Sequence, residues 1–359
     1  MSKFNAAVIG AGMIASAHCE AYCNNSETQL VAVADPIAER ASAFGSKYGA
    51  KSFVDYTKIL KEDTIDIVSI CTPDNTHADL AVEALNAGKH VVVEKPMALT
   101  LEDCDRIIDA QKRSGRELIV DFEYRINPFF VSMKKSVDSG ELGALKAMSI
   151  YYWRQPFRVK VNRWIHRSRF TSMMLQEACH YVDIFRWFCG EVEEVYAWAT
   201  KIRDDMEYDQ VAFTELSHEN GIHSQYSHTV VGNQFHHDVW LIGTRGAIKS
   251  SMVFSKVNGS YGEIMRKRFK EDITEDIVED FDLECFGARE VDDDPNIGRL
   301  IDDAISRLIS KKPPRVNAFD GRKSIELALA IEESAKMRKP VHLPLAMTPD
   351  FVTKRLHET

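Results

Sequence analysis

Short apolar runs alternate with longer amphipathic segments through the first third of the chain. Five runs have the length and residue types of buried strands, at 4–9, 30–34, 66–71, 90–94 and 118–122. Apolar positions between them repeat at helical spacing and predict helices at 13–24, 36–48, 77–87 and 101–114. Regular alternation of this kind predicts an α/β domain, residues 1–123, in which helices cover both faces of a parallel sheet.

The pattern changes in the rest of the chain, residues 124–359. After a helix expected at 128–139, strand-like segments follow one another near 145–155, 192–199, 209–217, 222–231, 237–242 and 246–253. One helix, about 172–189, interrupts them, and two further helices are expected to end near 310 and 338. This predicts an α+β domain built on a large, mostly antiparallel sheet, with C-terminal helices that could pack back on the first domain.

Composition narrows the class of protein. The chain has 359 residues, 45% apolar and 28% charged, with a net charge of −9, which is typical of a soluble globular protein without general affinity for nucleic acid or anionic membranes. No apolar run approaches the roughly 18 residues that span a bilayer, and no signal peptide is recognisable, so a cytoplasmic location is expected. Seven cysteines without framework spacing suggest free thiols.

A glycine pair follows the first predicted strand. Gly10 and Gly12 precede a helix, Ala15 stands where a third small residue is needed, and Asp35 closes the next strand. The glycine pair alone would occur by chance in a turn in about half of such cases. Together with the preceding strand, the following helix and the acid, it predicts a dinucleotide site with the pyrophosphate at the helix N-terminus. Since the Asp35 carboxylate would repel a 2′-phosphate and no cation follows it, NAD is favoured over NADP.

Two more segments follow strands of the predicted parallel sheet, where ligands bind. Glu94-Lys95-Pro96 ends one strand, so Lys95 would lie beside the nicotinamide and could exchange a proton with a reacting hydroxyl. Thr72 to His77 would form a loop over the cofactor. The structural alternatives are a lysine that begins a surface turn and a helix cap at Asn75 or Thr76.

Taken together, these motifs resemble the Gfo/Idh/MocA family of glucose–fructose oxidoreductase and inositol dehydrogenase. Tyr124-Arg-Ile-Asn-Pro128, Gly140 to Gly143 and the terminal 320–344 also fit, so the resemblance covers nearly the whole chain. It implies a Rossmann domain, an open C-terminal sheet that supports a dimer or tetramer, and NAD(P)-dependent oxidation or reduction of a sugar or cyclitol hydroxyl.

The resemblance also implies roles for individual residues. Lys95 and His180 match the catalytic pair, with Gln176 in the place of the usual aspartate. An amide cannot carry a proton at neutral pH, so Gln176 would contribute hydrogen bonds only, and Glu177 could partly substitute. Taken alone, His180 would be read as a core histidine. The expected cofactor-binding residues are Gly10, Gly12, Met13, Ile14, Asp35, Thr72, Pro73, Asn75, His77, Glu94, Lys95, Pro96 and Glu123.

A basic segment, 153–169, contains six Lys or Arg and two Trp without an acid. A segment of this kind could bind an anionic sugar or form a contact between subunits, and the sequence favours the two interpretations equally. The expected substrate-binding residues are Tyr124, Arg154, Arg163, Trp164, His166, Arg167, Gln176 and His180. Histidines at 218, 223, 228, 236 and 237 lack the spacing of a metal site, so no metal is expected.

The leading hypothesis is an NAD-dependent sugar oxidoreductase, a homo-oligomer acting on a small carbohydrate. Two alternatives remain open at this point. One is a redox-neutral glycosidase that works through a 3-keto intermediate, which would not consume NAD in proportion to product. The other is a non-catalytic dinucleotide-binding regulator, which Gln176 favours and the pair Lys95 and His180 disfavours.

Overall fold

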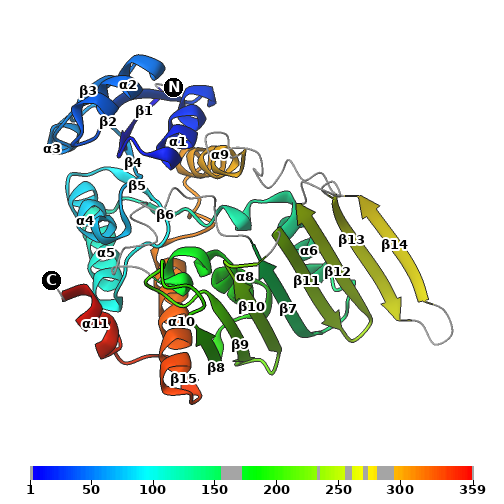
Figure 1. The fold of residues 1–359 in the computed structure, drawn as a ribbon. Helices are drawn as coiled ribbons and strands as arrows, with labels where there is room; N and C mark the ends of the chain where they lie inside the picture. The colour runs from blue at the N-terminus through cyan, green and yellow to red at the C-terminus, as the bar shows by residue number, and fades with distance from the viewer. Residues whose placement is uncertain are drawn as a thin grey trace. The chain divides into compact units, whose positions relative to one another are not determined.

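The computed structural model describes residues 3–154, 172–232, 235–254, 261–269, 274–280 and 295–357. The chain forms two compact units, one of Met1–Asn127 with Glu284–Ile325 and one of Pro128–Leu283 with Glu326–Thr359 (Figure 1). The predicted domain boundary at residue 123 lies four residues before Asn127, where the first segment of this unit ends. Residues 284–325, which the sequence analysis placed in the second domain, group with the first unit.

The first unit contains a six-stranded parallel sheet in the order β3-β2-β1-β4-β5-β6. This is the strand order of a Rossmann fold, whose ligand crevice lies beyond the carboxyl ends of the strands. The apolar runs are buried because helices cover both faces. Its strands are β1 (Phe4–Ile9), β2 (Thr28–Ala34), β3 (Lys51–Phe53), β4 (Ile67–Ile70), β5 (His90–Val93) and β6 (Leu118–Val120).

The helices of this unit agree with the sequence pattern except for short elements. β3 and the single turn α3 (Thr57–Leu60) were missed, because so few residues carry no periodicity. At the start of α5 the hydroxyl of Thr100 accepts the Asp103 N–H at 3.1 Å and so caps the helix. The longer helices are α1 (Met13–Asn24), α2 (Ala38–Tyr48), α4 (His77–Asn86) and α5 (Leu101–Ser114).

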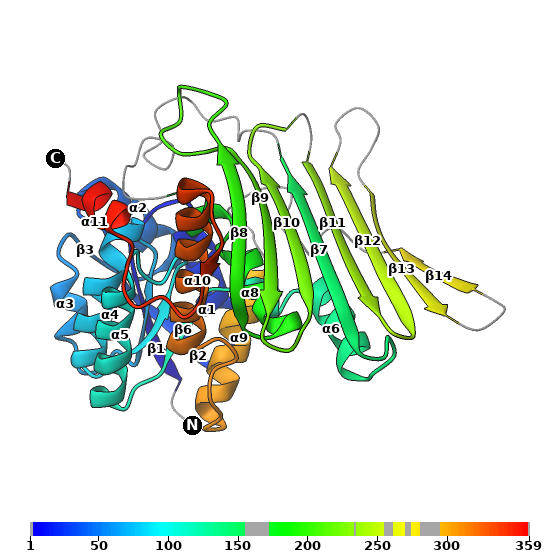
Figure 2. The ribbon, with the colours of Figure 1, turned by 90° about the horizontal axis from the view of Figure 1, so that it is seen from below.

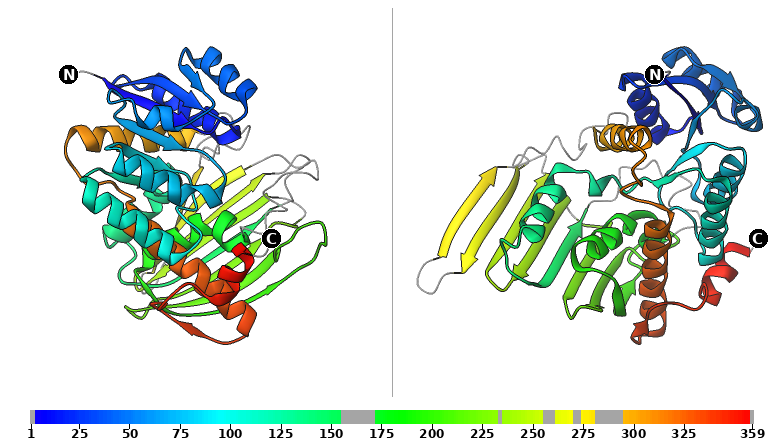
Figure 3. Two further views of the ribbon diagram at one scale, coloured as in Figure 1. Left: turned by 90° about the vertical axis from the view of Figure 1, so that its left-hand side faces the viewer. Right: turned by 180° about the vertical axis from the view of Figure 1, so that it is seen from behind.

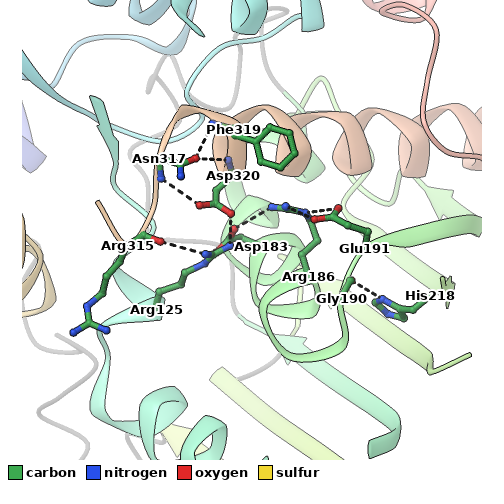
Figure 4. A network of polar contacts seen from close by, with 10 residues as sticks. All are labelled: Arg125, Asp183, Arg186, Gly190, Glu191, His218, Arg315, Asn317, Phe319 and Asp320. Carbon is green, nitrogen blue, oxygen red and sulfur yellow. Dashed lines mark hydrogen bonds and ion pairs between the residues drawn. The ribbon is translucent and has the colours of Figure 1, made fainter. Parts of the chain in front are cut away.

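A later segment completes the first unit. Helix α9 (Pro295–Ile309) lies beside α1, and its Leu300 and Ile301 join the apolar core (Figures 1 and 3). The next helix, α10 (Ala318–Met337), begins at Asn317, whose side-chain oxygen accepts the N–H groups of residues 319 and 320 at 2.9 and 3.1 Å. Asp320 forms an ion pair with Arg125 at 3.1 Å, which ties the 3-10 turn η2 (Glu123–Arg125) to this helix (Figure 4).

The second unit is built on a nine-stranded sheet in the order β14-β13-β12-β11-β7-β10-β9-β8-β15 (Figure 2). Its pairs are antiparallel except β7 with β10. The predicted α/β domain followed by an α+β domain with a mostly antiparallel sheet is therefore confirmed. The strands are β7 (Leu145–Trp153), β8 (Val192–Thr200), β9 (Val211–His218), β10 (His223–Thr229), β11 (Phe235–Gly243), β12 (Gly246–Phe254), β13 (Tyr261–Phe269), β14 (Thr274–Asp280) and β15 (Val341–His342).

Two strands at one margin of the sheet, β13 and β14, were not predicted from the sequence, and they pair with each other. Strands at the margin of a sheet often carry charged side chains, and the charged sequence of these two shows no clear alternation of apolar and polar residues. The helices of the unit are α6 (Pro128–Asp138), α8 (Cys179–Cys189) and α11 (Asp350–His357), besides the end of α10.

Large apolar side chains are exposed along the strands of this sheet. Trp198 on β8 is 41% exposed and lies 6.1 Å from Phe213 on β9, ring centre to ring centre. Tyr151 and Trp153 on β7 and Trp240 on β11 are exposed as well. A contiguous apolar face of this kind is more common at an interface than on the free surface of a monomer.

Further observations concern the described residues as a whole. Their cysteines are free: Cys19, Cys23, Cys71, Cys104, Cys179 and Cys189. Among these residues no helix combines the length and the apolar character that crossing a membrane requires.

His237 is a buried histidine that makes stability depend on pH. It is fully buried and packs on Phe130 and Tyr181, with ring centres 5.8 and 5.2 Å away. Burial and the neighbouring His236 lower the pKa of His237 to about 3. The unfolded chain, with an ordinary histidine pKa near 6.5, binds this proton first as pH falls. The contribution of neutral His237 to the free energy of unfolding is therefore fully present above pH 6.5 and is lost progressively as the pH falls toward 3.

We expect His237→Phe to weaken the acid sensitivity of the fold. Between pH 7 and 4.5 the unmodified protein should lose about 2 kcal/mol of unfolding free energy that the variant retains. Urea unfolding followed by tryptophan fluorescence measures the difference, with exposed His223→Gln as the control. Identical pH slopes in His237→Phe and the unmodified protein would contradict this assignment.

Candidate active site

The glycine turn after β1 is shaped by close approach of two chain segments. Gly10 has φ +100°, and a Cβ there would lie 2.2 Å from the carbonyl oxygen of Cys71. Gly12 is the N-cap of α1, no side chain caps this helix, and a Cβ on Gly12 would meet no described atom within 4 Å. Met13 is exposed and Ile14 half-buried. The turn thus leaves open space at a helix N-terminus, where a pyrophosphate binds.

Asp35 lies at the carboxyl end of β2, beside this turn. Its two carboxylate oxygens accept the backbone N–H groups of Ala11 and Ile37, at 2.9 and 2.8 Å. These bonds fix the carboxylate in the place where a Rossmann fold binds the ribose hydroxyls. Asp35 itself is 7% exposed, whereas Pro36 and Ile37 are exposed.

The loops after β4 and β5 meet at the same edge of the sheet. His77, at the start of α4, bridges them, because its Nδ1 lies 2.7 Å from the carbonyl oxygen of Pro96 and its Nε2 lies 2.8 Å from that of Thr72. The hydroxyl of Thr72 also contacts that of Thr76 at 2.7 Å. His77 is buried, so it holds the two loops together and does not reach into solvent.

Among the residues at this edge, Asn75 and Pro73 are exposed and Lys95 is half-buried. The first unit therefore brings together the predicted cofactor set at the carboxyl ends of β1, β2, β4 and β5. Glu123 and the predicted substrate residue Tyr124 follow β6 in the turn η2, half-buried.

Sequence reasoning missed a buried cluster behind Lys95. His18 on α1 contacts both Glu94 and Asp121, at 3.1 and 3.3 Å from its Nε2 atom. The available signal was a histidine on the inner face of α1 in line with acids that end two neighbouring strands. Nothing in the sequence indicated that these acids share one nitrogen.

His180 lies at the start of α8 in the second unit, 8% exposed. One continuous helix was expected over 172–189, but Met173–Glu177 form a single π-helical turn, η3, before α8 begins. The expectation was wrong in this detail, and the regular i, i+4 face shared by Gln176 and His180 is not preserved across the break. Turns of this type occur frequently at functional sites.

Ion pairs form before and after His180 along the chain. Arg154 is buried and forms an ion pair with Glu177, the last residue of the turn η3. The Glu177 carboxylate is therefore engaged by this arginine. On α8 itself, Arg186 pairs with Glu191 at 2.6 Å and with Asp183 at 3.6 Å (Figure 4). Burial would lower the pKa of Arg154, but the charge of Glu177 outweighs it and the pKa is raised.

The remaining predicted substrate residues lie outside the described part of the chain. They are Arg163, Trp164, His166 and Arg167. Lys95 and His180, the predicted catalytic pair, belong to different units.

The residues of the first unit fit a bound NAD. The close approach at Gly10, the open space at Gly12 and the fixed Asp35 carboxylate supply the turn, the anion site and the ribose acceptor that a dinucleotide needs.

Comparison with known proteins agrees with this geometry. Residues 4–122 match the family model described as the oxidoreductase family with an NAD-binding Rossmann fold. Residues 130–249 match the GFO/IDH/MocA C-terminal domain.

Individual relatives are similar over different lengths. The inositol 2-dehydrogenase of Salmonella typhimurium is 32% identical over 194 residues, which cover 52% of this chain and 54% of that protein. The chain therefore matches about half the length of this relative. The myo-inositol 2-dehydrogenase of Thermotoga maritima is 26% identical over 94% of this chain and 97% of its own.

A solved structure shows the same fold. Levoglucosan dehydrogenase, in complex with NADH and levoglucosan, aligns with a TM-score of 0.82 at 21% identity and covers 96% of this chain and 100% of its own.

Proposed function

Because this chain belongs to the Gfo/Idh/MocA family and has its NAD-binding domain, we propose that it is an NAD-dependent oxidoreductase acting on a hydroxyl of a sugar or cyclitol. The observation that carries the proposal is Lys95 at the carboxyl end of β5, at the same edge as the glycine turn and Asp35. Relatives named as inositol dehydrogenases support the substrate class.

Each residue has a role in this proposal. NAD, when bound, supplies the hydride acceptor. Lys95 takes the hydroxyl proton of the substrate, and His180 orients the substrate or relays that proton. Gln176 contributes hydrogen bonds only, since an amide neither gains nor loses a proton at neutral pH.

The test is a panel of cyclitols and sugars incubated with NAD and followed by NADH absorbance. At least one member should reduce NAD in proportion to product. Product without net NADH would favour the redox-neutral glycosidase instead. NAD binding without turnover on any member would favour a regulator and contradict the proposal.

We infer further that the substrate carries an anion. The support is the sequence of the segment 153–169. Apart from Arg154, which pairs with Glu177, the segment has five Lys or Arg and no acid in a chain of net charge −9. Guanidinium groups recognise carboxylates and phosphates by paired hydrogen bonds. The same panel tests this when each neutral sugar is paired with its carboxylate or phosphate form, and equal kcat/KM for both forms would contradict the inference.

Asp35 should decide which dinucleotide binds. A fixed carboxylate repels the extra phosphate of NADP, so we expect Asp35→Ser with Ile37→Arg to narrow the preference for NAD by tenfold or more. Titration of both cofactors by protein fluorescence measures it, with Ile37→Ala as the control for loss of the exposed side chain. Equal affinities in the unmodified protein would exclude the role of Asp35.

We propose that the exposed aromatic face of the large sheet joins copies of the chain into a homo-oligomer. Its members include Trp198, Phe213 and Trp240, each about 40% exposed in the single chain. A charge at its centre should therefore dissociate the assembly, and Phe213→Lys should lower the mass measured by light scattering to that of one chain. Exposed Lys112→Glu, on α5, is the control. A monomeric unmodified protein would refute the proposal.

A further inference from the structure

A buried cluster of three side chains lies at the carboxyl edge of the parallel sheet. His18 comes from α1, Glu94 follows β5 and Asp121 follows β6, with side chains 0%, 9% and 1% exposed. The His18 Nε2 atom lies 3.1 Å from Glu94 Oε1 and 3.3 Å from Asp121 Oδ2. One ring nitrogen therefore faces two carboxylates inside the first unit.

The number of protons in this cluster is limited by its geometry. The single N–H at Nε2 bonds to Glu94, and beyond the ion contact with His18 neither oxygen of Asp121 has a hydrogen-bond partner among the described residues. Two buried carboxylates this close to one nitrogen cannot both ionise without a large cost. The less solvated partner, Asp121, is therefore the one that keeps a proton near neutral pH.

The pKa directions agree with this division. Burial would raise the pKa of Glu94, but the hydrogen bond and charge of His18, with the charges of Lys95 and His77, lower it below its usual value. Burial and the charge of Glu94 raise the pKa of Asp121. Burial would lower the pKa of His18, yet contacts with Cys71, Asp121 and Glu94 raise it well above the ordinary histidine value.

The other ring nitrogen of His18 is also held. Its Nδ1 atom lies 3.1 Å from the hydroxyl of Ser69 on β4, and Ser69 in turn contacts the hydroxyl of Tyr22 at 2.8 Å. Ser69 and Tyr22 are fully buried. A ring fixed from both sides gives Glu94 one orientation.

Glu94 connects this cluster to the solvent-facing edge. It precedes Lys95 directly, its Oε2 atom accepts the Lys95 backbone N–H at 3.3 Å, and the Lys95 charge acts on its carboxylate. We propose that His18, Glu94 and Asp121 are positioning residues for Lys95. In this arrangement His18 fixes an ionised Glu94, whose charge sets the pH at which Lys95 changes from the ammonium to the neutral amine that can accept the substrate's proton. Asp121 remains protonated, so the cluster contains one buried negative charge and not two.

The importance of Lys95 for turnover rests on the proposed function, but its protonation is measurable without a substrate. Acetic anhydride acylates only the neutral amine, so the pH midpoint of Lys95 labelling in the whole protein reports its charge. Mass spectrometry reads the tryptic peptide 90–106, which retains Lys95 because proline follows it. Loss of an adjacent anion should move the midpoint in Glu94→Gln down by about one pH unit.

The control variants separate this effect from general destabilisation. Asp121→Asn, which mimics the protonated acid, should shift the midpoint by less than about a third of the Glu94→Gln shift. Exposed Asp109→Asn should not move it. A Glu94→Gln midpoint equal to that of Asp109→Asn would overturn the proposal, whatever the sugar panel shows.

A second measurement covers the case in which Glu94→Gln does not fold. The ¹⁵N shifts of His18 in the unmodified protein, assigned with His18→Gln, should be those of an imidazolium at pH 7.5. A neutral imidazole would overturn the proposal. A stoichiometric metal ion that is lost in Asp121→Asn would overturn it too, because an ion bound by these three side chains displaces the protons of His18 Nε2 and Asp121.

Discussion

Replacing Lys95 with alanine is expected to lower kcat by about 100-fold or more while NADH binds nearly as before. General base catalysis by a positioned side chain contributes about 10²- to 10⁴-fold, and this is the term the variant loses. NAD affinity comes instead from the glycine turn and Asp35, which alanine at position 95 leaves in place. Steady-state kinetics on the active sugar and fluorescence titration with NADH measure the two effects separately.

Lys112→Ala is the matched control, since that lysine is 72% exposed on α5 of the same unit. Its kcat should equal that of the unmodified protein. A Lys95→Ala enzyme with near-normal kcat on the true substrate would remove Lys95 from the mechanism. Equal losses of turnover and NADH affinity would assign it to cofactor binding only.

Much of the parallel-sheet unit could be predicted from sequence because its strands are short, apolar and buried on both faces. The helix predicted at 13–24 has the observed bounds, and Thr100 caps α5 through a local hydrogen bond. Features of this kind depend only on residues a few positions apart, so the local sequence predicts them. The grouping of 284–325 with this unit depends on contacts with α1 across the length of the chain, which no local pattern contains.

The antiparallel unit shows where periodicity fails. Strands β13 and β14 lie at one margin of the sheet in charged sequence, so alternation is weak. The π turn at Met173–Glu177 was read as ordinary helix, because one inserted residue hardly changes the apolar spacing.

In the candidate site, spacing along strands indicated Asp35 and Lys95 but not their partners. The two backbone N–H groups on Asp35 and the shared nitrogen of His18 arise from three-dimensional packing. The same holds for Arg154. Its place in the basic segment led to the prediction that it binds substrate, and its buried ion pair with Glu177 is again a result of packing.

His180→Ala should lower kcat by about 100-fold, with less effect on KM, if the ring relays or orients at the reacting hydroxyl. Gln176→Ala should act differently. Because an amide can only hydrogen-bond the bound substrate, its loss should raise KM by about tenfold and change kcat little. The carboxylate of Glu177, which was expected to substitute in part, is engaged in an ion pair with Arg154.

Steady-state kinetics of both variants on the active sugar give this comparison, with thermal unfolding as a check on the turn η3. The exposed His223→Gln serves as the histidine control. If Gln176→Ala reduced kcat as severely as His180→Ala, the amide would be positioning the proton-carrying ring itself. If His180→Ala changed only KM, the ring would be a binding group and Lys95 would handle the proton alone.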